Sequence, residues 1–193
     1  MIRIDSHAAA SLRYIRASIE GAASLAVPGS AGIVLGVLGL AAAALSSAPN
    51  FREHWLGIWL AAALIGGVIG SFLVVRESSL QNLRLAGTPL RKFALCLSPS
   101  IAAGLVMTWV HWSGGNLHAI PGTWLLLYGS ALIAASAATT RTIGILGGLF
   151  TLFGLAALLL PDGSQILVLG AGFGGLHIVF GFMIGWHGHG RKT

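Results

Sequence analysis

The chain has 193 residues, of which 55% are hydrophobic and only 8% are charged. A soluble domain carries about a quarter charged residues, so this composition excludes an ordinary soluble enzyme. The formal net charge of +6 lies almost wholly on one side of the membrane topology predicted below, which argues against nucleic-acid binding. Cys96 is the single cysteine, so an intrachain disulfide is excluded.

Residues 1–29 are predicted to form a cytoplasmic amphipathic arm. Apolar residues from Leu12 to Val27 recur at nearly helical spacing, and Arg13 and Arg16 lie on other faces. Such a helix is expected to lie in the membrane interface beside anionic headgroups. A regulatory or partner-binding arm is the alternative. The apolar run that follows starts too late in the chain to be the core of a cleaved signal peptide.

Six apolar runs follow, each long enough to cross a hydrocarbon layer of ~30 Å at ~1.5 Å per residue. They are residues 30–46, 55–75, 93–112, 124–140, 143–160 and 165–186. We therefore predict an all-α integral membrane protein whose six-helix transmembrane domain covers residues 30–186. Residues 187–193 form a short basic tail on the cytoplasmic side.

The basic residues predict the orientation of the spans. A six-span topology places on one side Arg3, Arg13, Arg16, Arg76, Arg84, Arg91, Lys92, Arg141, Arg191 and Lys192. Arg52 alone falls on the other side. This is the positive-inside pattern, so both termini are expected in the cytoplasm and the protein in the bacterial cytoplasmic membrane.

The spans are expected to form three consecutive hairpins. The outer turns contain Pro49, Pro121 and Pro161, and the segment that begins at Gly39 resembles the segment that begins at Gly154. Such similarity at a repeated spacing is typical of an internal repeat.

Pairs of glycines four residues apart predict close helix packing, because backbones approach closely where side chains are small. The pairs include Gly66 with Gly70, Gly170 with Gly174, and Gly181 with Gly185. These faces are expected to contact other helices of the chain, a second copy, or a partner in a membrane complex.

His177 is the polar residue of greatest interest, because no Asp or Glu lies within any predicted span. It lies ~18 Å below the outer surface, and an ionisable group at that depth is a functional hypothesis by default. A bis-histidine haem site is disfavoured, since His111 lies at a different depth. The simpler interpretation is a neutral imidazole bonded to Ser130, Ser136 or Thr151 on another helix.

Ser98, Pro99 and Ser100 interrupt the third span, where proline removes a backbone hydrogen bond and kinks a helix. If the protein is a small transporter or channel, its pore is expected near Ser98, Ser100, Ser130 and His177.

Three histidines, His54, His111 and His118, fall on the outer side. Histidine titrates between about pH 5 and 8, so they would form a pH-sensitive group if they converge. No site for a metal or a cofactor is predicted.

The pattern of a glycine-bearing span, a proline turn and a Leu-Gly-led return span resembles the HdeD-like small bacterial membrane proteins. Gly147, Gly154, Pro161, Gly170 and Gly181 carry this resemblance. The arm, the long second loop and His177 depart from it.

The resemblance implies a stress-related membrane protein and transfers no catalytic residue. We expect a non-enzymatic protein, stress-related or an accessory subunit of a membrane complex. The alternative is a small transporter or channel; a haem protein or a redox protein acting on a lipid-soluble substrate is a third.

Overall fold

The computed structural model describes residues 11–15, 25, 27–80, 88–161 and 163–189. These residues form helices joined by short turns, and none of them lies in a β-strand. Six of the helical segments are long and apolar enough to cross a membrane, which confirms the predicted number.

The helical elements follow one another with few intervening residues. They are α2 (Gly29–Ser47), the 3-10 helix η1 (Pro49–His54), α3 (Trp55–Leu80), α4 (Thr88–Ser113), α5 (Ala119–Ala135), the 3-10 helix η2 (Ser136–Ala138), α6 (Arg141–Leu159), α7 (Gln165–Leu169), the π-helical segment η3 (Gly170–Leu176) and α8 (His177–His189). The last three together make up the sixth span.

Three boundaries differ from the prediction. The third span begins at Thr88 and not at Phe93, so it includes Arg91 and Lys92. The fourth span begins at Ala119 and not at Trp124, so Pro121 lies in the first helical turn and not in the preceding loop. Proline fits there because the first turn needs no backbone N–H donor. The second span continues to Leu80 and includes Arg76.

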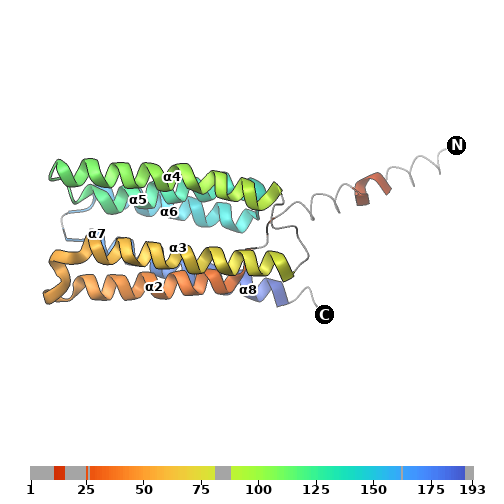
Figure 1. The fold of residues 1–193 in the computed structure, drawn as a ribbon, viewed down its shortest axis with the longest axis horizontal. Coiled ribbons are helices and arrows are strands. Elements are labelled where there is room, and N and C mark those ends of the chain that lie inside the picture. Colours follow the sequence, from red (N-terminus) through yellow and green to blue (C-terminus); the bar gives the residue numbers. More distant parts are fainter. Residues whose placement is uncertain (1–10, 16–24, 26, 81–87, 162, 190–193) are drawn as a thin grey trace.

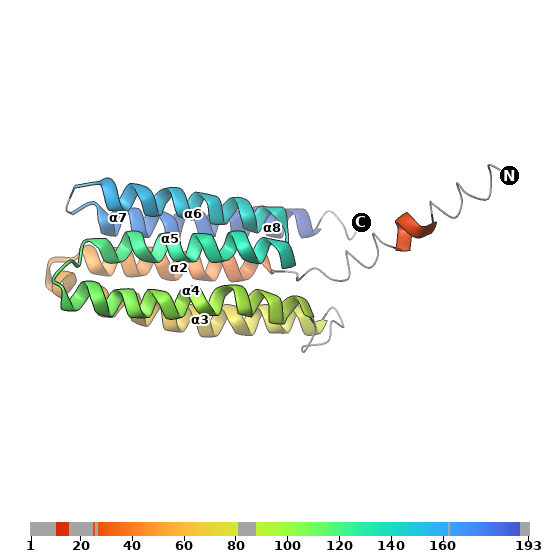
Figure 2. The same cartoon turned by 90° about the horizontal axis from the view of Figure 1, so that it is seen from above.

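The six spans form two layers of three helices (Figures 1 and 2). One layer has α5 at its centre, with α4 and α6 beside it, and we call it the α5 layer. The other has α2 at its centre, with α3 on one side and α7, η3 and α8 on the other, and we call it the α2 layer. The first residues of α2 and the last residues of α8 lie at the same end of the bundle (Figure 1).

Within each layer, one pair of helices is in backbone contact at glycines. A Cβ atom built on Gly147 of α6 would lie 2.6 Å from the Gly129 carbonyl oxygen of α5. One built on Gly181 of α8 would lie 2.7 Å from the Ile33 nitrogen of α2. These closest pairs, α5 with α6 and α2 with α8, join different predicted hairpins.

The other helix of each layer packs through larger side chains. Leu35 of α2 lies against Gly66 of α3, and the Trp124 ring of α5 lies against Gly104 of α4. α3 and α4 therefore lie less close to the neighbouring helices of their layers. They are also the least buried spans, with 17% and 11% of the residues of their apolar 18-residue stretches buried.

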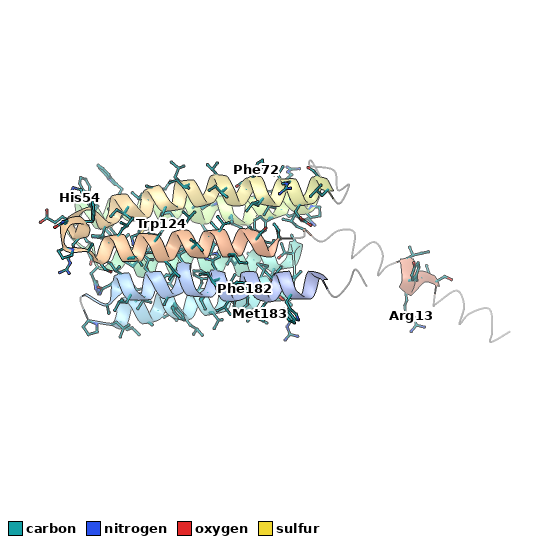
Figure 3. The ribbon with its side chains drawn as sticks, turned by 90° about the horizontal axis from the view of Figure 1, so that it is seen from below. Arg13, His54, Phe72, Trp124, Phe182 and Met183 are labelled. Atoms are coloured by element: carbon teal, nitrogen blue, oxygen red, sulfur yellow. The ribbon has the colours of Figure 1, made fainter. Side chains whose placement is uncertain are left out.

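The core lies between the layers on the side away from α3 and α4. Its buried side chains come from α5 and α6 on one side and from α7 and α8 on the other: Leu125, Leu132, Ile143, Leu146, Phe150, Ala157, Leu169 and Phe180. Large apolar side chains elsewhere point outward, including Phe72 on α3 and Phe182 on α8 (Figure 3).

Much of the predicted arm lies outside the described residues, as do residues 81–87 and 190–193. In the described part of the arm, Leu12, Tyr14 and Ile15 are exposed, and Leu25 is buried. The Leu25 N–H donates to the Ala138 carbonyl at 2.9 Å, which ties this part of the chain to η2.

Candidate functional site

His177 lies where η3 meets α8, and only 4% of its surface is exposed. The segment before it, Gly170–Leu176, is π-helical, and four of its seven residues are glycines. A π-helical turn is wider than an α-helical one and is often found at functional positions. The sequence around His177 thus changes the local helix geometry at the one histidine predicted at membrane depth.

Both ring nitrogens of His177 have a hydrogen-bond partner. Nδ1 lies 3.0 Å from the Phe173 carbonyl oxygen, and Nε2 lies 3.0 Å from the Tyr128 hydroxyl of α5. A carbonyl oxygen only accepts, so Nδ1 carries the proton. In a neutral ring Nε2 is then the acceptor, and the Tyr128 hydroxyl donates to it. The hydrogen bond between Tyr128 and His177 therefore joins the two layers, and it leaves neither ring nitrogen of His177 without a partner.

Aromatic rings surround this connection. The ring centroid of Phe150 lies 5.0 Å from that of Tyr128 and 5.1 Å from that of His177. Phe173 lies 5.1 Å from Phe150 and 6.0 Å from His177, and Trp59 of α3 lies 6.2 Å from Phe173. Rings at these separations attract one another and leave little room for water. His177 is therefore held in an apolar, closely packed environment.

Tyr128 is the functional residue that the sequence reasoning missed. The partners expected for His177 were Ser130, Ser136 and Thr151, and each of these donates to a carbonyl of its own helical segment or the adjoining one. A signal was present, because Tyr128 is the only tyrosine within a predicted span. Its hydroxyl needs a partner when buried.

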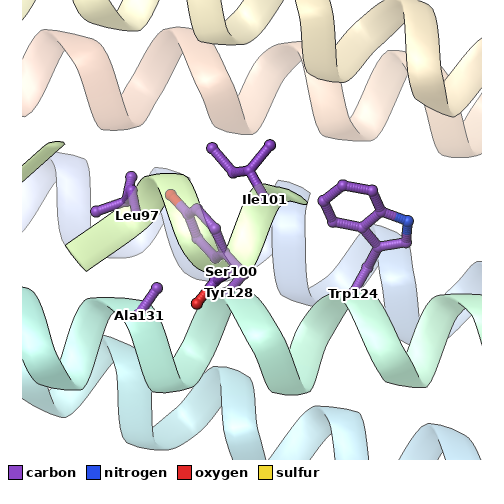
Figure 4. A pocket seen from close by; sticks show the side chains of 6 residues that line it. All are labelled: Leu97, Ser100, Ile101, Trp124, Tyr128 and Ala131. Atoms are coloured by element: carbon purple, nitrogen blue, oxygen red, sulfur yellow. The ribbon is translucent and has the colours of Figure 1, made fainter. Parts of the chain in front are cut away.

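A small cavity lies beside Tyr128, between α4 and α5 (Figure 4). Its volume is about 10 Å³, and the residues that line it are Leu97, Ser100, Ile101, Trp124, Tyr128 and Ala131. A volume of this size holds about one water molecule. The Trp124 Nε1–H donates to the Thr108 hydroxyl at 2.9 Å, which joins α5 to α4 next to this cavity.

The polar residues predicted around a pore are not brought together. Ser98 and Pro99 are exposed on the outside of α4, and Ser100 is half-buried beside Tyr128. Ser130 is exposed and donates to the Leu127 carbonyl of its own helix at 2.8 Å. Of this group, Ser100 alone lines the cavity beside Tyr128.

The three histidines that were predicted on the outer side have separate surroundings. His54 is exposed in η1 at the turn end of the bundle (Figure 3). His111 lies 3.3 Å from the Thr123 hydroxyl, and His118 accepts at Nδ1 from Gln165 Nε2 at 2.9 Å. Gln165 is 7% exposed and belongs to α7, so this second bond also joins the two layers.

A larger cavity of about 140 Å³ lies at the end of the bundle that holds His118 and Gln165. It is lined by residues of three turns and helix ends: Trp55, Leu117, His118, Pro121, Gly163, Gln165 and Ile166. Among the described residues, no group of three His, Cys, Asp or Glu side chains is arranged to hold a metal ion.

The six predicted packing glycines have different neighbours. Gly181 faces the backbone of α2, and Gly174 and Gly170 face Leu40 and Ala43 of the same helix. Gly66 and Gly70 face the Leu35 side chain, and a Cβ on Gly185 would meet nothing within 4 Å.

Among the residues that the structure describes, two buried polar atoms have no hydrogen-bond partner, Ser46 Oγ in α2 and Trp59 Nε1 in α3. Such atoms are rare in native structures, because an unpaired buried donor raises the free energy of the folded state. Trp59 packs against the core between the layers.

The arrangement around His177 can hold helices together, because both hydrogen bonds of its ring are made to other residues of the protein. The rings that contact His177 are those of Tyr128, Phe150 and Phe173. Comparison with family models, with curated proteins and with solved structures found no match to this chain.

Proposed function

We propose that the chain is a non-enzymatic, multi-pass protein of the cytoplasmic membrane that serves as an accessory subunit of a membrane complex. The observation that carries this proposal is the closed environment of His177, whose ring nitrogens are both bonded within the protein. The most conspicuous polar group at membrane depth is thereby used for structure.

A partner would bind over α3, which presents two glycines to open space. A Cβ built on Gly57 or Gly67 would meet no atom within 4 Å, whereas the adjacent Gly66 is occupied by Leu35. Apolar helices associate in a bilayer mainly where small residues permit close approach. These open glycines support α3 as the face for another membrane helix.

The finer topology is part of the proposal. The spans would cross as three hairpins with both termini in the cytoplasm, and the arm at residues 1–29 would lie on the inner membrane surface. The placement of Arg76, Arg91, Lys92 and Arg141 near the ends of spans on the predicted cytoplasmic side supports this orientation. The exposed Leu12, Tyr14 and Ile15 support contact with a membrane surface.

The resemblance to HdeD-like proteins supports a stress-related role for the complex. A transporter has less support, because Ser98 and Ser130 lie on the outside of the bundle rather than beside His177. The cavity beside Tyr128 is also too small, at about 10 Å³, for a cargo larger than water.

The proposal is tested by tagged purification in mild detergent followed by mass spectrometry. We expect a second membrane protein in a fixed ratio to the tagged chain. Gly67→Leu should reduce its recovery at least several-fold, because the new side chain occupies the proposed contact. Gly148→Leu on α6 is the matched control, since Gly148 also faces open space, and it should leave recovery unchanged. Recovery of the monomer alone from the unaltered chain would contradict the proposal.

A further inference from the structure

Positive charge gathers at one corner of the bundle, where α3 ends and α4 begins. Arg76 lies in the last turns of α3, and Arg91 and Lys92 lie near the start of α4. The two helices run along the same edge of the bundle, and these parts of them lie at the same end (Figures 1 and 2). We call these three residues the basic edge. The other lysines and arginines in the described part of the chain are Arg13, Arg52 and Arg141.

The cations of the basic edge have no carboxylate partner. All three are exposed, and among the described residues none of them forms an ion pair with Asp or Glu. Glu77 is the one acidic residue of α3 and α4. It follows Arg76 directly in the helix, and consecutive residues of a helix do not face each other. The positive charge of the basic edge is therefore left for a group outside the chain to neutralise.

Large exposed apolar side chains lie one helical turn from two of these cations. Phe72 lies one turn before Arg76, is 64% exposed and points outward from α3 (Figure 3). Leu95 lies one turn after Arg91 in α4 and is 57% exposed. Residues four apart share one face of a helix. Each helix thus presents a cation near its end and an apolar side chain one turn further into the span.

A phospholipid with a negatively charged headgroup matches this order of groups. Its phosphate lies at the level of basic residues at the ends of spans, and its acyl chains run from there into the hydrocarbon layer. Arginine donates two parallel hydrogen bonds to phosphate oxygens, and lysine adds a compact positive charge. A soluble anion would make no use of the exposed Phe72 and Leu95, so the arrangement favours a lipid.

We propose that the basic edge, with the apolar faces of α3 and α4 beside it, binds an anionic phospholipid in preference to a zwitterionic one. The phosphate lies at the basic edge, and the acyl chains lie along Phe72 and Leu95. The inference requires that the helices cross a membrane, for which they are long and apolar enough. It depends neither on the proposed partner nor on which side of the membrane the basic edge faces.

The test measures lipid binding to the full chain, purified in mild detergent and mixed with phosphatidylglycerol or with phosphatidylcholine of the same acyl chains. Native mass spectrometry reports the lipid that stays bound. Arg76→Gln and Arg91→Gln each remove one charge from the basic edge. Arg52→Gln in η1, at the opposite end, and Arg141→Gln at the start of α6 remove the same charge from other exposed positions. These two are the matched controls, and circular dichroism checks that all four variants stay folded.

We expect the unaltered chain to retain phosphatidylglycerol several-fold better than phosphatidylcholine. Arg76→Gln and Arg91→Gln should each lower the retention of phosphatidylglycerol about fivefold, the effect of one basic residue beside an anionic membrane surface. Arg52→Gln and Arg141→Gln should leave it unchanged.

Four outcomes overturn the proposal. Equal retention of the two lipids shows no preference for the anionic headgroup. An equal loss in Arg52→Gln or Arg141→Gln shows an effect of net charge and not of the basic edge. A loss in only one of Arg76→Gln and Arg91→Gln shows that the two helices do not share the site. Displacement of the lipid by an equal concentration of glycerol phosphate shows a site for a soluble anion.

Discussion

At the scale of single residues, Tyr128 and His177 join the layers at a depth where the bilayer offers no water. Each polar group there must find its partner within the protein. His177 does so twice, through Phe173 of its own helical segment and Tyr128 of α5. Both ring nitrogens of this ionisable residue are thus used in hydrogen bonds, one within its own helical segment and one to the other layer.

The strength of this connection is measurable with Tyr128→Phe, His177→Phe and the double variant. Each single variant should destabilise the protein, because it leaves a buried polar atom of its partner unpaired. We expect the coupling free energy from the cycle to be roughly 0.6 kcal/mol, with about 1.7 kcal/mol as the upper bound for such bonds in a membrane protein. Unfolding from mixed detergent micelles gives the values.

Ser130→Ala provides the baseline, since the Ser130 hydroxyl bonds only within its own helix. A coupling free energy of zero between Tyr128 and His177 would show that the 3.0 Å contact contributes nothing to stability.

At the scale of elements, neighbouring glycines of one helix have opposite roles. Gly147 and Gly148 follow one another in α6, yet a Cβ on Gly147 would lie 2.6 Å from the Gly129 carbonyl oxygen, and one on Gly148 would meet no atom within 4 Å. The backbone of α5 cannot move aside as a flexible side chain would. Gly147 therefore determines how closely α5 and α6 approach.

We expect Gly147→Ala to destabilise the protein by about 1–3 kcal/mol, the usual cost of overpacking a filled interface. Gly148→Ala adds the same methyl group to the same helix and should change stability by less than about 0.5 kcal/mol. Thermal unfolding in detergent, monitored by circular dichroism, compares the two. Equal changes of stability in the two variants would mean that the contact with Gly129 contributes nothing, because the higher helix propensity of alanine acts alike at both positions and favours the helix.

At the scale of the whole molecule, the number of spans followed from the sequence, but the pairs of spans in closest backbone contact did not. Runs of apolar residues show where helices lie, and the depth of His177 follows from counting along its span. Depth alone does not show which helices are neighbours. Tyr128 meets His177 because α5 packs next to η3, across two predicted hairpins.

The glycine pairs also show that a sequence pattern does not determine which helices are neighbours. Gly181 contacts a backbone, whereas Gly66 accommodates a leucine side chain, although both occur in the same four-residue spacing. The spacing marks a face that permits close approach, and the arrangement of the other helices decides what occupies it. Apart from its glycines, nothing in the sequence of Gly170–Leu176 indicated that this segment is π-helical.

The orientation of the whole molecule in the membrane is the last quantity to test. In a Cys96→Ala background, single cysteines are placed at Asn50 in η1, at Asn116 before α5, and at Ser79 near the end of α3, all at exposed positions. The positive-inside pattern predicts that a membrane-impermeant maleimide labels the first two in intact bacterial cells. Ser79→Cys should react only after the membrane is permeabilised. Because Arg76, Arg91, Lys92 and Arg141 all act in the same direction, removing any one of them should leave the labelling unchanged. Labelling of Ser79→Cys in intact cells would contradict this topology and indicate the reverse one, with both ends of the six-helix domain outside.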